Sequence, residues 1–396
     1  MKRLECLDGL RGVLAVYVMV GHMAPFSALP DWTIRLLSHG GAAVDVFFVL
    51  SGMVIVRSLE SHGYAARPFL VARVARIFPV YLAMFAVAVA AQAVPVSFAA
   101  MPWIGPDSLA RDIWASGWPA HWGVEIAAHL TMTHGLFPNG VLPDVWVSFL
   151  GAAWSLSTEW QFYVLALVWG RLGPRLPRVG GLAAFLMVLA GAGLVWDLGA
   201  PEAWRFSRAF LPNKAHYFAL GVASSGLAVF RGAAGDGVFG RGWAVFLAVI
   251  AAVMGVCAAQ GGVEKIIPPV VWAICLAAQA GPGRLWIVEA PLRAPFVQYL
   301  GVISYPIYLA NEPVQRVLGV ALAAWAGGDA WAFSAVWLPG AVLLPLGAAA
   351  VLHRYVERPG IRLGRVLCQP ALPLALGGAI RPAIAGRSTT LTKSAP

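Results

Sequence analysis

The sequence predicts an all-α integral membrane protein, a bundle of about ten transmembrane helices with both the N- and C-termini in the cytoplasm. Hydrophobic residues make up 60% of the 396 residues and charged residues 12%, whereas a soluble domain carries about 25% charged residues. Apolar runs of about 20 residues, the length that crosses a bilayer, recur along the chain. They occupy residues 9–27, 40–58, 73–94, 146–170, 180–198, 209–230, 241–259, 265–281, 296–322 and 331–354.

The placement of Lys and Arg predicts the orientation. With a cytoplasmic N-terminus, the loops on the cytoplasmic side hold most of the basic residues, as the positive-inside rule requires. We therefore expect a multi-pass protein of the inner (cytoplasmic) membrane. The net charge of +10 then suits anionic lipid head groups of the bilayer, and no nucleic-acid partner is expected.

Arg11 and His22 stand out in the first span. They are eleven positions apart, roughly three helical turns, so both lie on one stripe about 16 Å apart along the axis. Ionisable groups inside a span usually mark a pathway or a reaction site, which makes both residues catalytic candidates. The alternatives are a structural histidine and a signal peptide. His22 interrupts the apolar run and no small-residue cleavage site is evident, so a signal peptide is disfavoured.

The second and third spans add a carboxylate and two arginines. Asp45 lies in an otherwise apolar run and needs a partner. Arg11 and His22 are plausible partners, and a helix–helix clamp without chemistry is the alternative role for Asp45. Arg73 and Arg76 project from the same side of a helix and form a fork of guanidinium groups suited to phosphate. Simple anchoring at the membrane surface is the alternative for this pair.

The fourth and ninth spans carry further polar stripes. Trp154, Ser155 and Glu159 line one region of the fourth span. A buried Glu beside a His can orient the ring and stabilise imidazolium, although Glu159 can also serve packing alone. The ninth span places Tyr305, Tyr308, Asn311 and Glu312 on an otherwise apolar helix. Polar stripes on four spans predict one shared interior cavity.

The chain reads as one transmembrane domain, residues 1–365, followed by a loosely ordered cytoplasmic tail, residues 366–396. An insertion at about 94–145 is rich in Trp and His; it is interpreted as either an aromatic belt or a lid over a site. The four cysteines are scattered without metal-ligand spacing, so neither a metal site nor a disulfide is expected.

Five motifs in order resemble the acyltransferase 3 family of multi-pass membrane acyltransferases: LDGLRGVLAVYVMVGH, VDVFFVLSG, FLVARVARIFPVY, WSLSTEWQFY and LGVISYPIYLANEP. The resemblance implies about ten helices, a cytosolic acyl-CoA donor and no tightly bound cofactor. It also implies transfer of acetyl or a similar acyl group to a hydroxyl, usually on a carbohydrate or glycolipid acceptor.

The resemblance also implies roles for individual residues. Arg11 and His22 match the essential first-helix pair, Arg73 and Arg76 match the arginines that engage the donor, and Ser155 and Glu159 match the polar positions of the WSL motif. One departure is Asn311, which stands where family members often have His. Asn cannot take a proton near neutral pH, so we expect Asn311 to position other groups while His22 supplies the titratable ring.

The expected function is therefore O-acyl transfer, with His22 as general base or transient acyl carrier. Arg11 is expected to stabilise negative charge on the donor or on the oxyanion. Glu159, or less favourably Asp45, is expected to orient the imidazole. The alternative is a transporter or flippase for a lipid-linked sugar, which the lack of an internal repeat disfavours.

Overall fold

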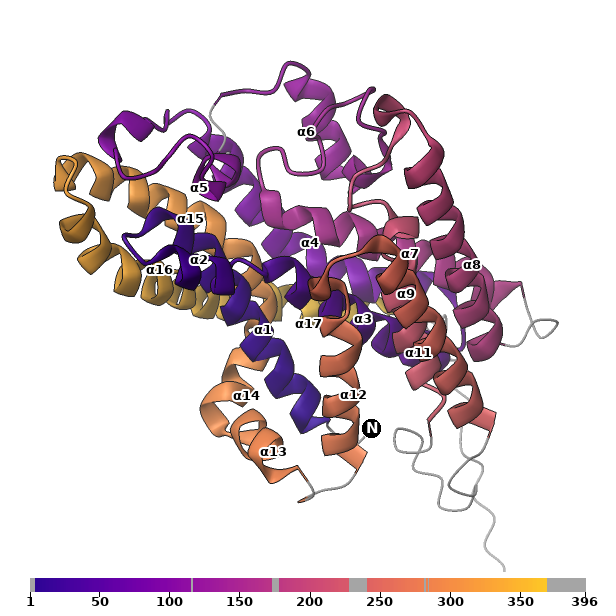
Figure 1. Ribbon diagram of the computed structural model, residues 1–396. Helices are drawn as coiled ribbons and strands as arrows, with labels where there is room; N and C mark the ends of the chain where they lie inside the picture. Colours follow the sequence, from indigo (N-terminus) through magenta and orange to yellow (C-terminus); the bar gives the residue numbers. More distant parts are fainter. Residues whose placement is uncertain are drawn as a thin grey trace, which may run out of the picture.

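The computed structural model describes residues 4–114, 117–172, 178–227, 241–280, 283 and 285–368. Within these ranges every regular element is a helix, and the strand-like pairing is confined to an isolated bridge between Pro138 and Phe206. The helices form a bundle in which α1 (Glu5–Met23) runs through the middle (Figure 1). The all-helical class predicted from the sequence is confirmed for this part of the chain.

Six helical segments of the described part are long and apolar enough to cross a membrane: Glu5–Phe26, Asp31–Ser61, Ala66–Ala91, Val179–Gly199, Gly242–Gln260 and Ala330–Cys368. They contain α1, α2 (Asp31–Leu37) with α3 (Gly40–Ser61), α4 (Ala66–Ala91), α8 (Arg178–Gly199), α11 (Arg241–Gln260), and α16 (Ala330–Leu352) with α17 (Arg358–Cys368). These helices support a multi-pass membrane protein.

The other four predicted spans correspond to helices that fall short of that standard of length and hydropathy. They are α7 (Trp154–Arg171), α9 (Ala215–Ser224), α12 (Ile267–Ala280) and α15 (Ser304–Ala326). Two are short, with 10 residues in α9 and 14 in α12, and the other two carry polar stripes. A total of ten spans and the cytoplasmic placement of the termini therefore stay predictions.

Several predicted boundaries differ from the structure, and two of the differences concern the site. The run 146–170 becomes helical as α7 only at Trp154, because the preceding segment contains left-handed residues such as Phe149 (φ 62°) and a short 3-10 turn, η4 (Gly151–Ala153). The run 296–322 is divided at Ile303 into α14 (Pro295–Val302) and α15. Both interruptions occur beside the polar residues of the site described below.

The insertion between α4 and α7 gathers at one end of the bundle. It contains η2 (Phe98–Ala100), α5 (Leu109–Ile113), α6 (Trp122–Leu130) and η3 (His134–Leu136). Figure 1 shows α5 and α6 at the top, opposite to the start of α1 and to α13 (Trp286–Arg293) and α14 at the bottom. The two ends of α1 thus point to different ends of the molecule.

Close backbone packing fixes the position of α1. This helix contacts α3, α13, α14 and α15. A Cβ added at Gly12 would lie 2.6 Å from the backbone nitrogen of Gly301 in α14, closer than any real Cβ contact. Because only glycine permits this approach, the side chains of α1 are held in a fixed register against α14 and its neighbours.

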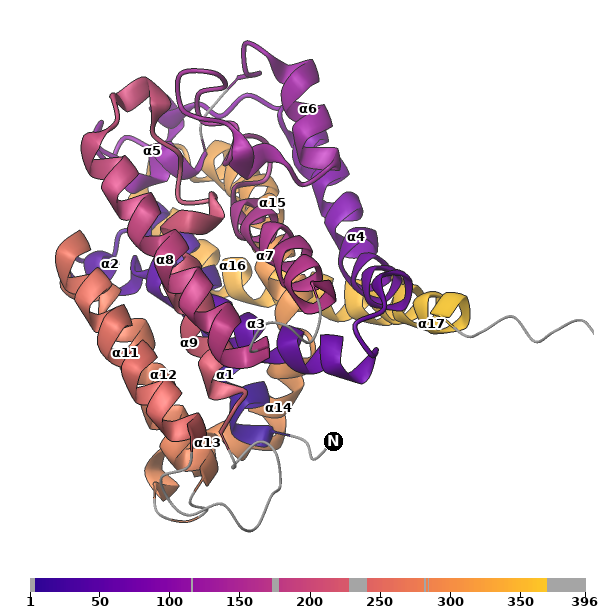
Figure 2. The same cartoon turned by 90° about the vertical axis from the view of Figure 1, so that its right-hand side faces the viewer.

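The C-terminal helices lie beside α4. Figure 2 shows α17 running along the start of α4 at the edge of the bundle, and Gly364 of α17 contacts Ala75 of α4. A π-helical turn, His353–Glu357, joins α16 to α17. The first residues of the predicted tail, 366–368, belong to α17, and residues 369–396 lie outside the described part of the chain.

Candidate active site

Arg11 and His22 open into two different cavities, although they share one helix face. We call them the arginine cavity, lined by Arg11, Arg73 and Arg76 among others, and the histidine cavity, lined by His22. Their volumes are about 130 Å³ and about 610 Å³. The single shared cavity predicted from the polar stripes is therefore wrong in detail, because the stripes divide between two spaces.

The arginine cavity collects side chains from five helices. Arg11 comes from α1, Arg73 and Arg76 come from α4, and further polar groups come from α7 and α15, namely Ser155, Glu159, Tyr163, Ser304, Tyr305 and Tyr308; α3 contributes Ser51 and apolar residues. Arg73 Nη2 donates a hydrogen bond to Ser58 Oγ at 2.9 Å, which fixes one side of its guanidinium group. The predicted Arg73–Arg76 fork thus faces a cavity and is joined there by Arg11.

Glu159 lies in the arginine cavity and not beside the imidazole. It is an electrostatic neighbour of both Arg11 and Arg73. His22 lines the other cavity. The structure therefore gives Glu159 a place among the guanidinium groups, and another residue must orient the His22 ring.

Asn311 is the residue that orients the His22 ring. His22 Nδ1 lies 2.7 Å from Asn311 Oδ1, while Asn311 Nδ2 donates to the carbonyls of Ile307 and Tyr308 at 3.1 and 2.7 Å. Because the amide nitrogen is committed to two acceptors, Oδ1 faces the ring, and the hydrogen-bond pattern assigns the proton to Nδ1. Nε2 then keeps its lone pair, as a general base requires.

Tyr308 lies where the two cavities adjoin. Tyr308 and Val44 line both of them. The Tyr308 hydroxyl lies 2.9 Å from Ser155 Oγ and 2.9 Å from the carbonyl oxygen of Ala152. Tyr305 is held nearby, because its hydroxyl donates to the carbonyl of Ile77 at 2.6 Å. A molecule in either cavity can therefore contact Tyr308.

Glu312 closes the histidine cavity next to His22. Its carboxylate accepts from the backbone nitrogens of Gly151 and Ala152 at 3.4 and 3.2 Å, and His22 is among its electrostatic neighbours. This contact explains the turn that precedes α7, since η4 presents its free N–H groups to the carboxylate. Glu312 is thus placed to stabilise a protonated His22.

The outer wall of the histidine cavity was missed by sequence reasoning. Arg208 lies over the rings of Trp146 and Trp154, at 5.1 and 5.8 Å from their centroids, and Asp112 and Asp144 also line the cavity. Of these five residues, only Trp154 was identified from the sequence as a candidate site residue. Asp112 and Asp144 belong to the insertion, whose Trp and His content did not distinguish a cavity wall from a membrane belt.

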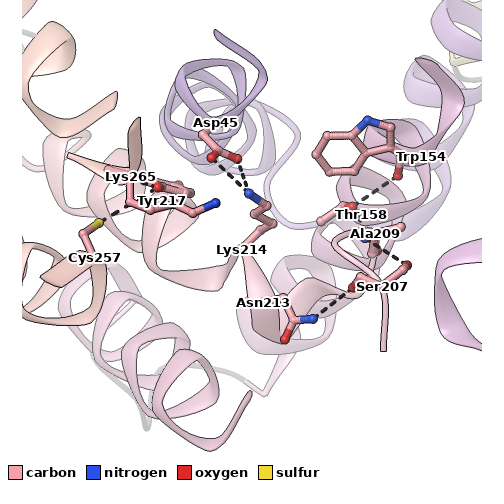
Figure 3. Close-up of polar contacts among 10 residues, drawn as sticks. All are labelled: Asp45, Trp154, Thr158, Ser207, Ala209, Asn213, Lys214, Tyr217, Cys257 and Lys265. Atoms are coloured by element: carbon pink, nitrogen blue, oxygen red, sulfur yellow. Dashed lines mark hydrogen bonds and ion pairs between the residues drawn. The ribbon is translucent and has the colours of Figure 1, made fainter. Parts of the chain in front are cut away.

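Asp45 has a partner that the sequence did not predict. Lys214 Nζ lies 2.7 and 3.0 Å from its two carboxylate oxygens (Figure 3), and neither Arg11 nor His22 is its ion-pair partner. Both side chains are buried. Close by, Thr158 Oγ1 donates to the carbonyl of Ala209 at 2.9 Å. Asp45 therefore clamps α3 to the start of α9, the alternative role considered for it above.

Two buried histidines support the cavity from outside the spans. The rings of His129 and His134 stack at 4.0 Å, and their Nε2 atoms lie 2.9 and 3.1 Å from the carbonyls of Val145 and Ala153. Burial lowers the pKa of His134 to about 4 and also lowers that of His129. Both rings are therefore neutral at pH 7 and act as structural donors. His129 ties α6 to Val145, and His134 ties η3 to η4.

Comparison with known proteins identifies the family. The sequence profile of the acyltransferase 3 family, described as an acyltransferase domain, matches residues 4–353. The chain is also similar to acyltransferase MdmB of Streptomyces mycarofaciens, with 26% identity over 395 residues that cover 91% of this chain and 92% of MdmB. No solved structure matches significantly. The chain therefore belongs to the acyltransferase 3 family and is an acyltransferase enzyme.

Proposed function

We propose that this protein is a membrane O-acyltransferase that moves an acyl group, acetyl in the first instance, from acyl-CoA to a hydroxyl of a carbohydrate-containing acceptor. The observation that supports this most is the pair of cavities that both border Tyr308. One is lined by three guanidinium groups and the other by a histidine whose Nδ1 is bound to Asn311. This division suits two substrates that arrive separately.

The donor binds in the arginine cavity from the cytosolic side. Acyl-CoA is a polyanion, and Arg11, Arg73 and Arg76 offer charge-assisted, bidentate hydrogen bonds to phosphate oxygens. The acyl thioester then extends toward Tyr308. No tightly bound cofactor is needed, because the thioester is itself the activated group.

The acceptor binds in the histidine cavity. Trp146 and Trp154 offer flat apolar faces that suit the C–H face of a sugar ring, and Asp112 and Asp144 accept hydrogen bonds from sugar hydroxyls. Binding sites typically combine such apolar walls with a few placed polar groups. The cavity volume of about 610 Å³ leaves room for more than the reacting hydroxyl.

Chemistry takes place where the cavities meet. His22 Nε2 removes the proton of the acceptor hydroxyl as its oxygen bonds to the thioester carbonyl carbon. The C–S bond then breaks, and the imidazolium returns the proton to the departing coenzyme A sulfur. Asn311 holds the ring in the required tautomer, and Glu312 stabilises the transient imidazolium.

The test is release of free coenzyme A. Purified protein is mixed with acetyl-CoA and candidate glycan acceptors, and the freed thiol is followed with a thiol-reactive dye. His22→Ala should lower the rate by about 100-fold or more, whereas His121→Ala, an exposed histidine of the insertion, should not. Equal release by H22A at normal expression would contradict the proposal. Movement of a lipid-linked sugar without thiol release would instead favour a flippase.

A further inference from the structure

The helix α17 carries a charged and an apolar surface that the mechanism above does not use. It is the last part of the 39-residue segment Ala330–Cys368, which is apolar enough to cross a membrane and about twice as long as a bilayer requires. The first part, α16, has 23 residues and is long enough to span by itself. Figure 2 shows α17 running outward at the edge of the bundle, across the direction of α8. We therefore expect α17 to lie at the membrane surface, where α16 ends.

One face of α17 is fixed to α4. Gly360, Gly364 and Cys368 recur every four residues and so lie on the same side of the helix. A Cβ added at Gly360 would lie 2.6 Å from the carbonyl oxygen of Ala75, and Cys368 Sγ donates to the carbonyl of Pro68 at 3.4 Å. Because the two backbones approach so closely, α17 cannot turn about its axis without losing this contact, and the directions of its other side chains are fixed.

The rest of the α17 surface divides into two exposed stripes. The basic stripe consists of three exposed residues, Arg358, Arg362 and Arg365. The apolar stripe consists of Leu363, Val366 and Leu367, whose exposed fractions are 59%, 64% and 52%. At about 100° per residue, the two stripes lie roughly 120° from each other and from the face that contacts α4. They therefore flank that contact on opposite sides.

The basic stripe has no acidic partner within the described residues. None of its three guanidinium groups forms an ion pair there, and the α17 sequence RPGIRLGRVLC contains no Asp or Glu. The carboxylate that directly precedes α17 belongs to Glu357, which is buried and bound to His353 Nδ1 at 2.7 Å. The positive charge of the stripe is therefore available to an external anion.

An anionic lipid surface matches both stripes. A helix that lies in the membrane interface buries its apolar side among the acyl chains and keeps its basic side at the head groups. Clusters of four or more basic residues just beyond a membrane-crossing helix are typical of binding to anionic lipid, and Arg354 with the basic stripe makes four. An acidic protein would match the arginines, but the apolar phase next to the end of α16 is the bilayer.

We propose that α17 is an interfacial helix that binds anionic phospholipid, with the basic stripe at the head groups and the apolar stripe among the acyl chains of the same leaflet. This inference does not depend on the proposed transfer reaction. It predicts that anionic lipid is concentrated beside the start of α4, the helix that supplies Arg73 and Arg76.

The test is quenching of a fluorescent probe by brominated lipid. Full-length Leu363→Cys protein is labelled with bimane and reconstituted in vesicles of phosphatidylcholine and phosphatidylglycerol, of which one or the other is brominated in its acyl chains. Wild-type protein treated in the same way gives the background from the half-buried Cys368. Both lipids should quench the probe, and phosphatidylglycerol should do so about fivefold more strongly per mole, the factor that corresponds to one arginine near an anionic surface. No quenching by either lipid would overturn the proposal.

A probe on the basic stripe tests the orientation of α17. Arg362→Cys changes the residue next to Leu363, which belongs to the other stripe. The bimane at this position should be quenched less than the bimane of L363C by either lipid. Equal quenching at the two positions would mean that lipid surrounds both stripes, which contradicts an interfacial helix.

The role of charge is tested in the labelled L363C protein. Adding Arg358→Gln, Arg362→Gln and Arg365→Gln should remove the preference for phosphatidylglycerol and leave the quenching by phosphatidylcholine. Without these substitutions, about 1 M salt should weaken the preference, because it shortens the screening length to about 3 Å. The salt measurement decides the outcome if the triple variant does not fold. A preference that persists at high salt would overturn the proposal.

A matched control is Val188→Cys. Val188 is 70% exposed on α8, another helix that is long and apolar enough to cross a membrane. Its bimane should be quenched equally by the two lipids per mole, with and without the three arginine substitutions. The same preference for phosphatidylglycerol at this position would show that anionic lipid surrounds the whole protein, and α17 would then have no lipid site of its own.

Discussion

At the scale of single residues, the cost of burying polar groups made the site partly predictable. Arg11 and His22 were recognisable because a cation and an imidazole are expensive within an apolar helix. The partner of His22 was not recognisable, since Asn311 lies 289 residues away. Glu159 was expected to orient the His22 ring, because the spacing of residues along α7 does not show how deep Glu159 lies relative to the residues of α1. Lys214 was missed because a lysine near the start of a span is expected to be an interfacial anchor.

Asn311 gives a direct prediction. Asn311→Leu should lower kcat by about 10- to 100-fold with little change in either KM, because the Nδ1–H group loses its acceptor and the ring is free to rotate or change tautomer. Asn311→Asp should retain most of the rate, because the acceptor oxygen is kept. Steady-state kinetics of coenzyme A release measures both. Wild-type kcat in N311L would show that the hydrogen bond of 2.7 Å does not position the ring.

At the scale of helices, the apolar runs located most elements, but not the breaks beside the site. The breaks at Ile303 and before Trp154 have tertiary causes: Glu312 binds the N–H groups of η4, and α14 passes close to Gly12. Neither contact is visible in a hydropathy pattern. The π turn is equally hidden, because the residues of HRYVE are compatible with an ordinary α-helix.

The clamp between α3 and α9 predicts a non-additive effect on stability. Asp45→Leu or Lys214→Met alone should each lower the stability by about 3–5 kcal/mol, since each leaves an unpaired buried charge. The double variant should recover a large part of this loss, because no charge then remains in the apolar contact. Thermal unfolding in detergent measures all three. A double variant as unstable as the sum of the singles would argue against the clamp.

The stacked histidines of the insertion predict a pH dependence. Their folded-state pKa is lowered, to about 4 for His134, whereas an unfolded histidine titrates near pH 6.5. The unfolded state therefore binds protons first as the pH falls, so stability is full above about pH 6.5 and declines toward pH 4, by about 3 kcal/mol from His134.

The measurement is the unfolding temperature between pH 4 and 7.5. His134→Phe keeps a ring to stack on His129 but cannot titrate, so its unfolding temperature should depend less steeply on pH. A slope identical to that of the wild type would assign the acid sensitivity to other groups.

At the scale of the whole molecule, composition was sufficient for an all-helical membrane fold, and ordered motifs were sufficient for the family. The division into two cavities was not predictable, because it depends on which helix ends meet. The insertion supplies α5 to the histidine cavity at the end of the bundle opposite to α13 and α14 (Figure 1). Because the insertion lies next to that cavity, its interpretation as a lid is favoured over its interpretation as an aromatic belt.

This arrangement predicts sidedness in proteoliposomes. Acyl-CoA should support transfer when it is supplied on the face that bears the N-terminus, because the arginine cavity lies toward the start of α1. A water-soluble acceptor should be modified only on the opposite face. Liposomes loaded with acceptor and sorted by orientation provide the measurement, and detergent should abolish the asymmetry. Equal transfer with acyl-CoA supplied on either face of sealed vesicles would contradict binding of donor and acceptor from opposite faces.

Tyr308 has one further consequence. It lines both cavities, and its hydroxyl is bound to Ser155 and Ala152. An acetyl unit that changes its bond from sulfur to oxygen beside this ring is shielded there by an aromatic side chain. Tyr308→Gly should therefore admit water to the thioester and raise the release of coenzyme A in the absence of an acceptor.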